Sequence, residues 1–372
     1  MYYDAIDLLK GMISRPSFSR EEGEVADFLK KSWEKAGYKV NRKGNNLWLI
    51  APGFDLDKPT LLLNSHIDTV KPASGWTKDP FKPEETEDER LYGLGSNDAG
   101  ASVVSLYEAF RVLSGKEQPY NLIFLASCEE EVSGKNGLES ALADLPPISF
   151  AVVGEPTGMQ PAIAEKGLMV LDCVSTGKAG HAARNEGINA ITLAMKDIEW
   201  FNTYQFPEKS DFLGPVKMSV TIIHAGTQHN VIPDRCILLG TIRTFSARTR
   251  AQAKARLEAL TAGIAAAWGC TAAVGWTDGT PALCNDAGLA AAMERAAVSV
   301  FGKSGCVQIE PQMISEDFAC YGSEVPICCA LLGVGSPVGL HSAAFCPDSS
   351  VLLPAARFLA ESAWSVLEDA RA

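Results

Sequence analysis

The feature that most constrains the fold is an alternation of short apolar runs with segments of helical periodicity. Continuous apolar runs of this length are typical of strands that are buried on both faces of a sheet. A strand, helix, strand order favours a parallel sheet with helices on its faces. We therefore predict an α/β domain. The apolar runs lie at 47–51, 60–64, 121–127 and 150–154, and the helical patterns between them lie at 99–113 and 135–142.

Length and composition bound the remaining possibilities. At about 150 residues per domain, 372 residues correspond to about two domains. Hydrophobic residues make up 47% of the chain, enough for a sizeable core, so a disordered protein is excluded. The formal net charge of -12 argues against nucleic acid and anionic membranes as partners, because both require a basic surface.

The sequence also predicts a cytoplasmic protein. No apolar run approaches the ~18 residues of a membrane span, and the first residues lack the basic and apolar segments of a signal peptide. The ten cysteines are scattered and form no C-x-x-C pair, which favours buried, reduced thiols over a disulfide framework.

A helix is predicted near the N-terminus. The segment Ser19–Glu22 has the pattern of a capping box, in which a serine and a glutamate three residues later bind each other's backbone N–H groups. The helix that it opens is expected to end at about Gly37. Its apolar face would consist of Val25, Phe28, Leu29 and Trp33.

A second, smaller unit of α+β character interrupts the first. From about Glu165 the pattern predicts strands at 168–176, 217–225 and 235–245, and helices at 189–201 and 247–268. The α/β character then returns, with a helix at 287–301, an apolar run at 327–334 and a last helix from about residue 354. We therefore predict a discontinuous domain of residues 1–166 and 279–372, with residues 167–278 inserted into it.

Histidines and carboxylates follow the ends of several predicted strands. In open α/β sheets, ligands bind beyond the carboxyl ends of the strands, so these side chains are expected to share one edge. Taken singly, each has a plain structural explanation, such as a hydrogen-bonded histidine, a solvated acidic run or a turn. Because they occur together at several independent strand ends, a functional site is favoured over these separate explanations. The residues are His66, Asp68, Asp98, Glu129, Glu130, Glu131, Glu155 and His341.

This combination is suited to divalent metal ions. Histidine nitrogen and carboxylate oxygen are the usual ligands of zinc, but one catalytic zinc takes only three protein ligands. A larger set suits two metals about 3.5–4 Å apart that share a carboxylate. In the segment His66–Asp68, the aspartate could accept the second ring N–H of the histidine, as the partners of metal-bound imidazoles usually do.

At these residues the sequence resembles the M20 family of di-zinc peptidases and deacylases. The matching segments occur in the order typical of the family and span residues 65–342. They are Ser65–Val70, Tyr92–Gly100, Glu129–Glu131, Gly154–Thr157, Gly180–Ala182, Asn230–Pro233 and Leu340–Ser342.

The resemblance implies a metal ligand set. His66 and Glu155 would bind one zinc, and Glu130 and His341 the other. Asp98 would bridge the two metals and be followed by a cis peptide bond to Ala99. Two Zn²⁺ ions per chain are expected, although Co²⁺ accepts the same ligands.

The resemblance also implies the other roles. Asp68 would orient His66, and Glu129 would be the general acid/base. His181 would reach across a homodimer into the partner's active site; the alternative is a surface histidine with no such role. Asn230 and Arg243 would bind the substrate, with Arg243 paired to its carboxylate; an ion pair with an acid of the inserted domain is the alternative.

The implied fold is α/β, with a mixed sheet flanked by helices, as in zinc exopeptidases, and an inserted α+β dimerisation or lid domain. The implied reaction is hydrolysis of the amide bond of an N-acyl amino acid. The expected substrate is N-acetylornithine, or an acetylated or succinylated ornithine or citrulline, in arginine biosynthesis. The alternatives are a succinyl-diaminopimelate desuccinylase and a dipeptidase or carboxypeptidase of the same fold. A scaffold protein without activity is a further alternative.

Overall fold

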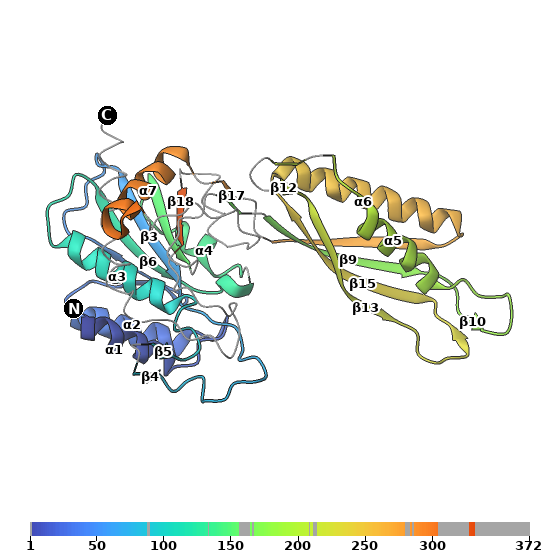
Figure 1. Cartoon of the computed structure of the whole chain (residues 1–372), viewed down its shortest axis with the longest axis horizontal. Helices are drawn as coiled ribbons and strands as arrows, with labels where there is room; N and C mark the ends of the chain where they lie inside the picture. The colour runs from blue at the N-terminus through green and yellow to red at the C-terminus, as the bar shows by residue number, and fades with distance from the viewer. Residues whose placement is uncertain are drawn as a thin grey trace. The chain divides into compact units, whose positions relative to one another are not determined.

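The chain forms two compact units, seen in a computed structural model (Figure 1). Unit 1 comprises Met1–Ile163, Cys284–Glu310 and Glu316–Ala372, and unit 2 comprises Ala164–Leu283 and Pro311–Ser315. The prediction that the second unit is a lid or dimerisation domain stays a prediction. The structure describes residues 2–87, 90–132, 134–155, 164–165, 167–207, 209–210, 214–279, 283–284, 286–303 and 327–331.

The main sheet among the described strands of unit 1 is mixed, in the order β1-β2-β6-β3-β7-β18. The strands β6, β3, β7 and β18 are parallel to one another, whereas β2 runs antiparallel to both of its neighbours, β6 and the edge strand β1. The expectation of an α/β fold is confirmed, but the apolar run near residue 47 is antiparallel to its neighbour. The strands are β1 (Asn41–Lys43), β2 (Asn46–Ile50), β3 (Thr60–His66), β6 (Asn121–Ser127), β7 (Phe150–Glu155) and β18 (Ile327–Leu331).

Helices cover one face of this sheet with a continuous apolar core. Alternate residues of the strands, such as Leu61 and Leu63 of β3, face the helices and are buried. Figure 1 shows α1, α2 and α3 together on this side. The helices are α1 (Tyr2–Ile13), α2 (Gly23–Lys35), α3 (Gly100–Ser114) and α7 (Ala287–Phe301).

Helix α2 differs from its prediction at the N-terminus. Its buried residues Val25, Leu29 and Trp33 repeat every four positions, as predicted. The capping box is wrong, however. The helix begins at Gly23, so Glu22 is its N-cap residue, and the Glu22 side chain makes no cap hydrogen bond. The hydroxyl of Ser19 donates instead to Asp68, at 2.7 Å.

The described part of unit 2 contains a four-stranded antiparallel sheet in the order β13-β15-β9-β16, packed on two helices. Strand β9 alternates buried and more exposed residues, as expected for a sheet with one covered face. The sequence pattern predicted neither β16 here nor α1 in unit 1. The elements are β9 (Gly167–Thr176), β13 (Lys217–Ala225), β15 (Arg235–Thr244), β16 (Thr271–Asp278), α5 (Ala190–Thr203) and α6 (Ala247–Ala267).

The remaining described elements are short. No helix in the described ranges has the length and apolar character needed to cross a membrane. The predicted helix from about residue 354 lies outside the described residues. The short elements are β4 (Glu84–Glu85), β5 (Leu91–Tyr92), η1 (Glu130–Val132), α4 (Leu138–Leu142), β8 (Ala164–Glu165), β10 (Gly180–His181), β11 (Lys209–Ser210), β12 (Gly214–Pro215), β14 (Val231–Ile232) and β17 (Leu283–Cys284).

Candidate metal centre

Three neighbouring parallel strands of unit 1 end at the same edge of the sheet. His66, the last residue of β3, pairs with Ser127, the last residue of β6. Strand β7 lies on the other side of β3 and ends at Glu155. The acidic run Glu129–Glu131 follows β6 after one residue. The strand order therefore brings the predicted histidine and carboxylates together.

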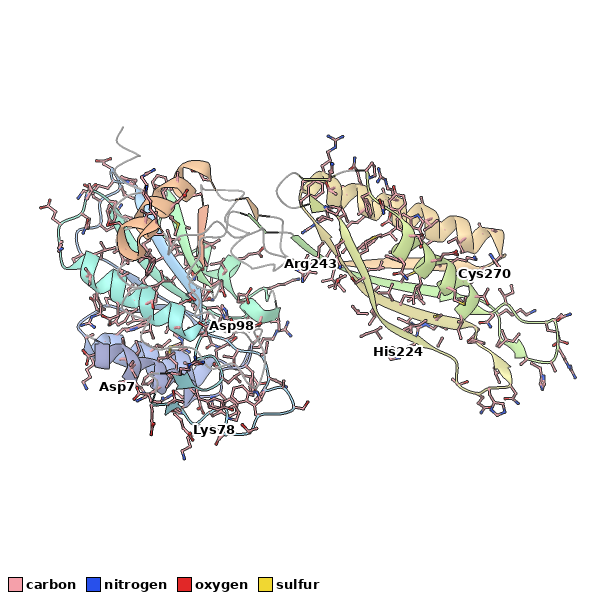
Figure 2. The ribbon with its side chains drawn as sticks, viewed as in Figure 1. Asp7, Lys78, Asp98, His224, Arg243 and Cys270 are labelled. Atoms are coloured by element: carbon pink, nitrogen blue, oxygen red, sulfur yellow. The ribbon has the colours of Figure 1, made fainter. Side chains whose placement is uncertain are left out.

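His66 lies at the middle of this group. Its Nε2 atom is 3.2 Å from Oδ1 of Asp98 and 3.4 Å from Oε1 of Glu155. Asp98 lies just before helix α3 and is labelled in Figure 2. The peptide bond between Asp98 and Ala99 is cis, as the resemblance implied.

The second nitrogen of His66 faces Asp68. Nδ1 lies 3.0 Å from the backbone oxygen of Asp68 and 3.3 Å from Oδ1 of its carboxylate. When Nδ1 carries the proton and donates it to these acceptors, Nε2 presents a lone pair to Asp98 and Glu155. A metal-binding imidazole needs this arrangement.

The charges around His66 favour a cation. Burial alone would lower the pKa of His66, yet the Glu155 carboxylate and hydrogen bonds to Asp68, Asp98 and Glu155 raise it well above its usual value. His66 is 2% exposed and Glu155 4%. Buried carboxylates are costly without a compensating positive charge. Imidazole nitrogen and carboxylate oxygen are the donors that zinc and similar ions take. The residues present therefore fit a divalent metal.

Glu131 is the member of the acidic run that groups with His66 and Asp98. One ligand atom each of His66, Asp98 and Glu131 lies within 4.8 Å of the other two. This differs by one residue from the ligand set that the resemblance implied.

The side chain of Glu129 has other partners. Its Oε1 accepts a hydrogen bond of 2.9 Å from Nδ2 of Asn136, and its Oε2 lies 3.9 Å from Nε of Arg20. A Cβ atom added at Gly134 would overlap with Oε2 of Glu129, so the side chain packs directly over that glycine. Glu129 thus lies against the turn that includes Gly134 and Asn136.

Asp68 fixes the rest of the run. Its two carboxylate oxygens accept hydrogen bonds of 3.1 Å from the backbone N–H groups of Glu130 and Glu131. Burial would raise the pKa of Asp68, but the hydrogen bonds from His66, Ser19 and the Glu130 backbone lower it below its usual value. The carboxylate is therefore ionised and links the histidine to the acidic run.

The remaining predicted residues lie elsewhere. His181 is on β10 of unit 2, and Asn230 directly precedes its partner strand β14; the backbone oxygen of Asn230 accepts from Ala182 N–H at 3.0 Å. Both side chains are exposed. Arg243 is on β15 (Figure 2). His341 lies outside the described residues. No role was predicted for Glu131, because three adjacent glutamates carry no signal that selects one of them.

The sequence matches that of known proteins over most of its length. The profile of peptidase family M20/M25/M40 matches residues 62–365. The N-acetyl-L-cysteine deacetylase of Bacillus subtilis is 28% identical over 369 residues, which cover 95% of this chain and 86% of that one. The acetylornithine deacetylase of Proteus mirabilis is 32% identical over 66% of this chain and 68% of its own length.

Solved structures share the fold. A Bacillus subtilis protein described as a dinuclear metal binding peptidase of the M20 family has a TM-score of 0.79 at 21% identity, covering 99% of this chain and 98% of that one. A tripeptidase from Staphylococcus aureus has a TM-score of 0.80 at 19% identity, covering 99% of each chain. Because the profile match extends over more than half of its length, this chain belongs to peptidase family M20/M25/M40 and is a metallohydrolase.

Proposed function

We propose that this protein hydrolyses the amide bond of an N-acyl amino acid at a divalent metal centre built on His66, Asp98 and Glu131. The observation that carries the proposal is the convergence of these three ligand atoms within 4.8 Å at the sheet edge. Relatives described as deacetylases that match over two thirds or more of their own length support the reaction class.

We infer two metal ions, as in the structural relative described as dinuclear. His66 and Glu155 would hold one, Glu131 and His341 the other, and Asp98 would bridge them. Zinc is the expected metal and cobalt the alternative. When bound, such a pair polarises a carbonyl and lowers the pKa of water towards neutrality.

The acidic run then supplies the proton carrier. With Glu131 as the ligand, Glu130 takes the general-base position directly before it. Its carboxylate would accept the proton of the attacking water and return it to the departing amine. The alternative is the register implied by the resemblance alone, in which Glu129 is the base and Glu130 the ligand. The contacts of Glu129 with Asn136 and Gly134 favour the first register.

The substrate is tested by a side-by-side assay of purified, metal-loaded protein. We place N-acetylornithine first and N-acetylcysteine second, the latter because the relative described as acting on it aligns over 95% of this chain. The other arms are N-acetylcitrulline, N-succinylornithine, succinyl-diaminopimelate and a dipeptide. An acylated amino acid should be cleaved best, with chelator-sensitive turnover. A dipeptide as the best substrate would overturn the substrate class, and no turnover in any arm would favour a scaffold protein.

We further propose a homodimer formed through unit 2. Strand β13 is an edge of the described sheet, and its side chains Ile222 and Ile223 are 43% and 49% exposed. An exposed apolar edge strand is a template for pairing with another copy. Light scattering should give a dimer for the wild type and a monomer for Ile223→Lys. A monomeric wild type would refute this part.

His181 is proposed to complete the partner's active site. It is exposed on the β10–β14 ribbon, where its Nδ1 accepts from the N–H of Ala183 at 3.1 Å. With Nδ1 as acceptor, the ring proton is on Nε2, and this N–H would stabilise the oxyanion that develops at the carbonyl. Mixed dimers of His181→Ala and Glu130→Gln should regain part of the wild-type turnover. No recovery in dimers shown to be mixed would place His181 in the site of its own chain.

A further inference from the structure

The backbone of the acidic run is held by side chains from three other segments. Four successive N–H groups, those of residues 128–131, each donate to a side-chain oxygen at 3.1 Å. Cys128 donates to Asn46 at the start of β2, Glu129 donates to Glu22, and Glu130 and Glu131 donate to Asp68. The run is thus positioned one residue at a time by tertiary contacts.

Glu22 is the unexpected member of this set. It occupies the N-cap position of α2, yet its side chain makes no hydrogen bond to that helix. Its Oε1 accepts instead from the N–H groups of Arg20 and Glu129, at 2.6 and 3.1 Å, and its Oε2 accepts from Nδ2 of Asn45 at 2.8 Å. Glu22 is 0% exposed. Full burial of a carboxylate is costly unless hydrogen bonds compensate for the loss of water. The bond from Glu129, 107 positions away in sequence, is one of those that compensate.

The backbone of Glu129 explains what this contact does. Its φ of +59° lies in the left-handed region, which residues other than glycine adopt at a cost in free energy. The N–H group of this same residue donates the hydrogen bond to Glu22. The conformation there separates Glu129, which lies against Gly134, from Glu131, which lies beside His66 and Asp98. A change at residue 129 would therefore move the two carboxylates that follow.

We propose that Glu22 is a positioning residue for the hydrolytic reaction. Its carboxylate holds the Glu129 backbone in the left-handed conformation and so sets the directions of the Glu130 and Glu131 side chains. Asn46 supports the preceding residue in the same way, because its Oδ1 accepts from Cys128 while its Nδ2 donates to the oxygen of Asn136 at 2.7 Å. The role in turnover rests on the proposed function, whereas the role in holding the backbone does not.

Two conservative variants separate this role from helix capping. Aspartate is a better N-cap residue than glutamate, so Glu22→Asp should maintain or improve a cap. It is one methylene shorter, however, and cannot keep the bond to Glu129. Glu22→Gln keeps the length and an acceptor oxygen. If Glu22 positions the acidic run, the glutamine variant should therefore resemble the wild type more closely than the aspartate variant; a capping role predicts the opposite order.

The experiment measures amide hydrogen exchange of residues 128–132 together with kcat and KM. For Glu22→Asp we expect exchange in this segment to rise at least about 10-fold. We expect kcat to fall about 10- to 100-fold, with KM changed less than about 3-fold. Glu22→Gln should stay closer to the wild type in both readouts. A matched control is Asp286→Ala, which removes the cap of α7, where Asp286 accepts from Leu289 N–H at 2.9 Å. It should lower the melting temperature and leave both readouts unchanged.

Each outcome decides the question. Exchange and kcat of Glu22→Asp at wild-type values would overturn the proposal. Faster exchange with unchanged kcat would limit Glu22 to a structural role and also overturn it. If the wild type hydrolyses no substrate, the proposed function fails, and with it the role in turnover, but the exchange measurement still decides whether Glu22 holds the acidic run.

Discussion

The two units bury carboxylates in opposite ways. In unit 1, Asp68 is fully buried and receives hydrogen bonds from Ser19, His66 and two backbone N–H groups, so its pKa is lowered. In unit 2, Asp197 is 1% exposed and accepts one hydrogen bond, from the hydroxyl of Thr261 at 3.1 Å. Burial therefore raises the pKa of Asp197 to about 6.

This contrast distinguishes an acid that is held ionised at the candidate site from one that burial makes easier to protonate. A buried group stays charged only where several donors or cations converge on it. Such convergence is found at the strand ends of unit 1, around Asp68 and His66. Asp197 has one hydroxyl as its partner, so it becomes neutral below about pH 6 and contributes to the packing of α5 against α6. Three substitutions test the contrast, in order of decreasing expected effect.

The largest effect is expected within the acidic run of unit 1. Glu130→Gln removes the proposed base and should lower kcat at least about 1,000-fold, whereas Glu129→Gln should lower it no more than about 10-fold. The smaller effect follows because an amide at position 129 can still accept from Asn136. Steady-state kinetics of both variants, each checked for metal content, measure the difference. A larger loss for Glu129→Gln would restore the register implied by the family resemblance.

A smaller effect is expected at Asp68. In Asp68→Asn, an NH₂ group replaces one carboxylate oxygen. This donor would face the N–H and O–H donors that now bind that oxygen. The misplaced donor should disturb both His66 and the acidic run, and kcat should fall about 100-fold. Ser19→Ala serves as the milder partner variant, because it removes one of the donors and leaves the carboxylate intact. Equal activities of Asp68→Asn and the wild type would show that the carboxylate positions nothing.

The smallest effect, on stability alone, is expected in unit 2. Because the pKa of Asp197 is higher in the folded protein than its usual 3.8, the folded state binds more protons between about pH 4 and pH 6. Stability is therefore lost as pH rises through this window, by up to about 3 kcal/mol at about 1.4 kcal/mol per pKa unit.

Asp197→Asn removes this loss, since its amide oxygen still accepts from Thr261. Thermal unfolding should show the variant to be more stable than the wild type near pH 8 but not near pH 4. The exposed Asp172→Asn is the control and should show no such pH dependence. A variant that is destabilised near pH 8 would mean that Asp197 is needed in its charged form.

The parts of the molecule that were predictable from sequence follow from local patterns. Buried parallel strands appear as apolar runs, and the residues directly after them reach the sheet edge whatever the details of packing. This placed His66 and Glu155 at one edge, and Asp98 was expected there because it opens the helix that follows the strand of His66. The direction of β2 was not predictable, because an apolar run has no sign that distinguishes parallel from antiparallel pairing.

The features that escaped prediction depend on contacts distant in sequence. Ser19 and Glu22 match a capping box locally, but Ser19 donates to Asp68, 49 positions away, and Glu22 accepts from Glu129, 107 positions away. The register of the glutamate triplet likewise depends on the φ of Glu129 and on its contact with Asn136. Local propensity cannot weigh such contacts, so sequence patterns indicated which residues lie near one another but assigned no reliable role to each glutamate.

The most direct test is the metal content of three proteins after loading and gel filtration, measured by plasma mass spectrometry. The wild type should retain about two divalent ions per chain. Glu131→Gln should lose at least one of them, and Glu130→Gln should retain both while being inactive. Wild-type metal content in Glu131→Gln together with loss in Glu130→Gln would contradict the centre described here, and a wild type that binds no metal would refute it entirely.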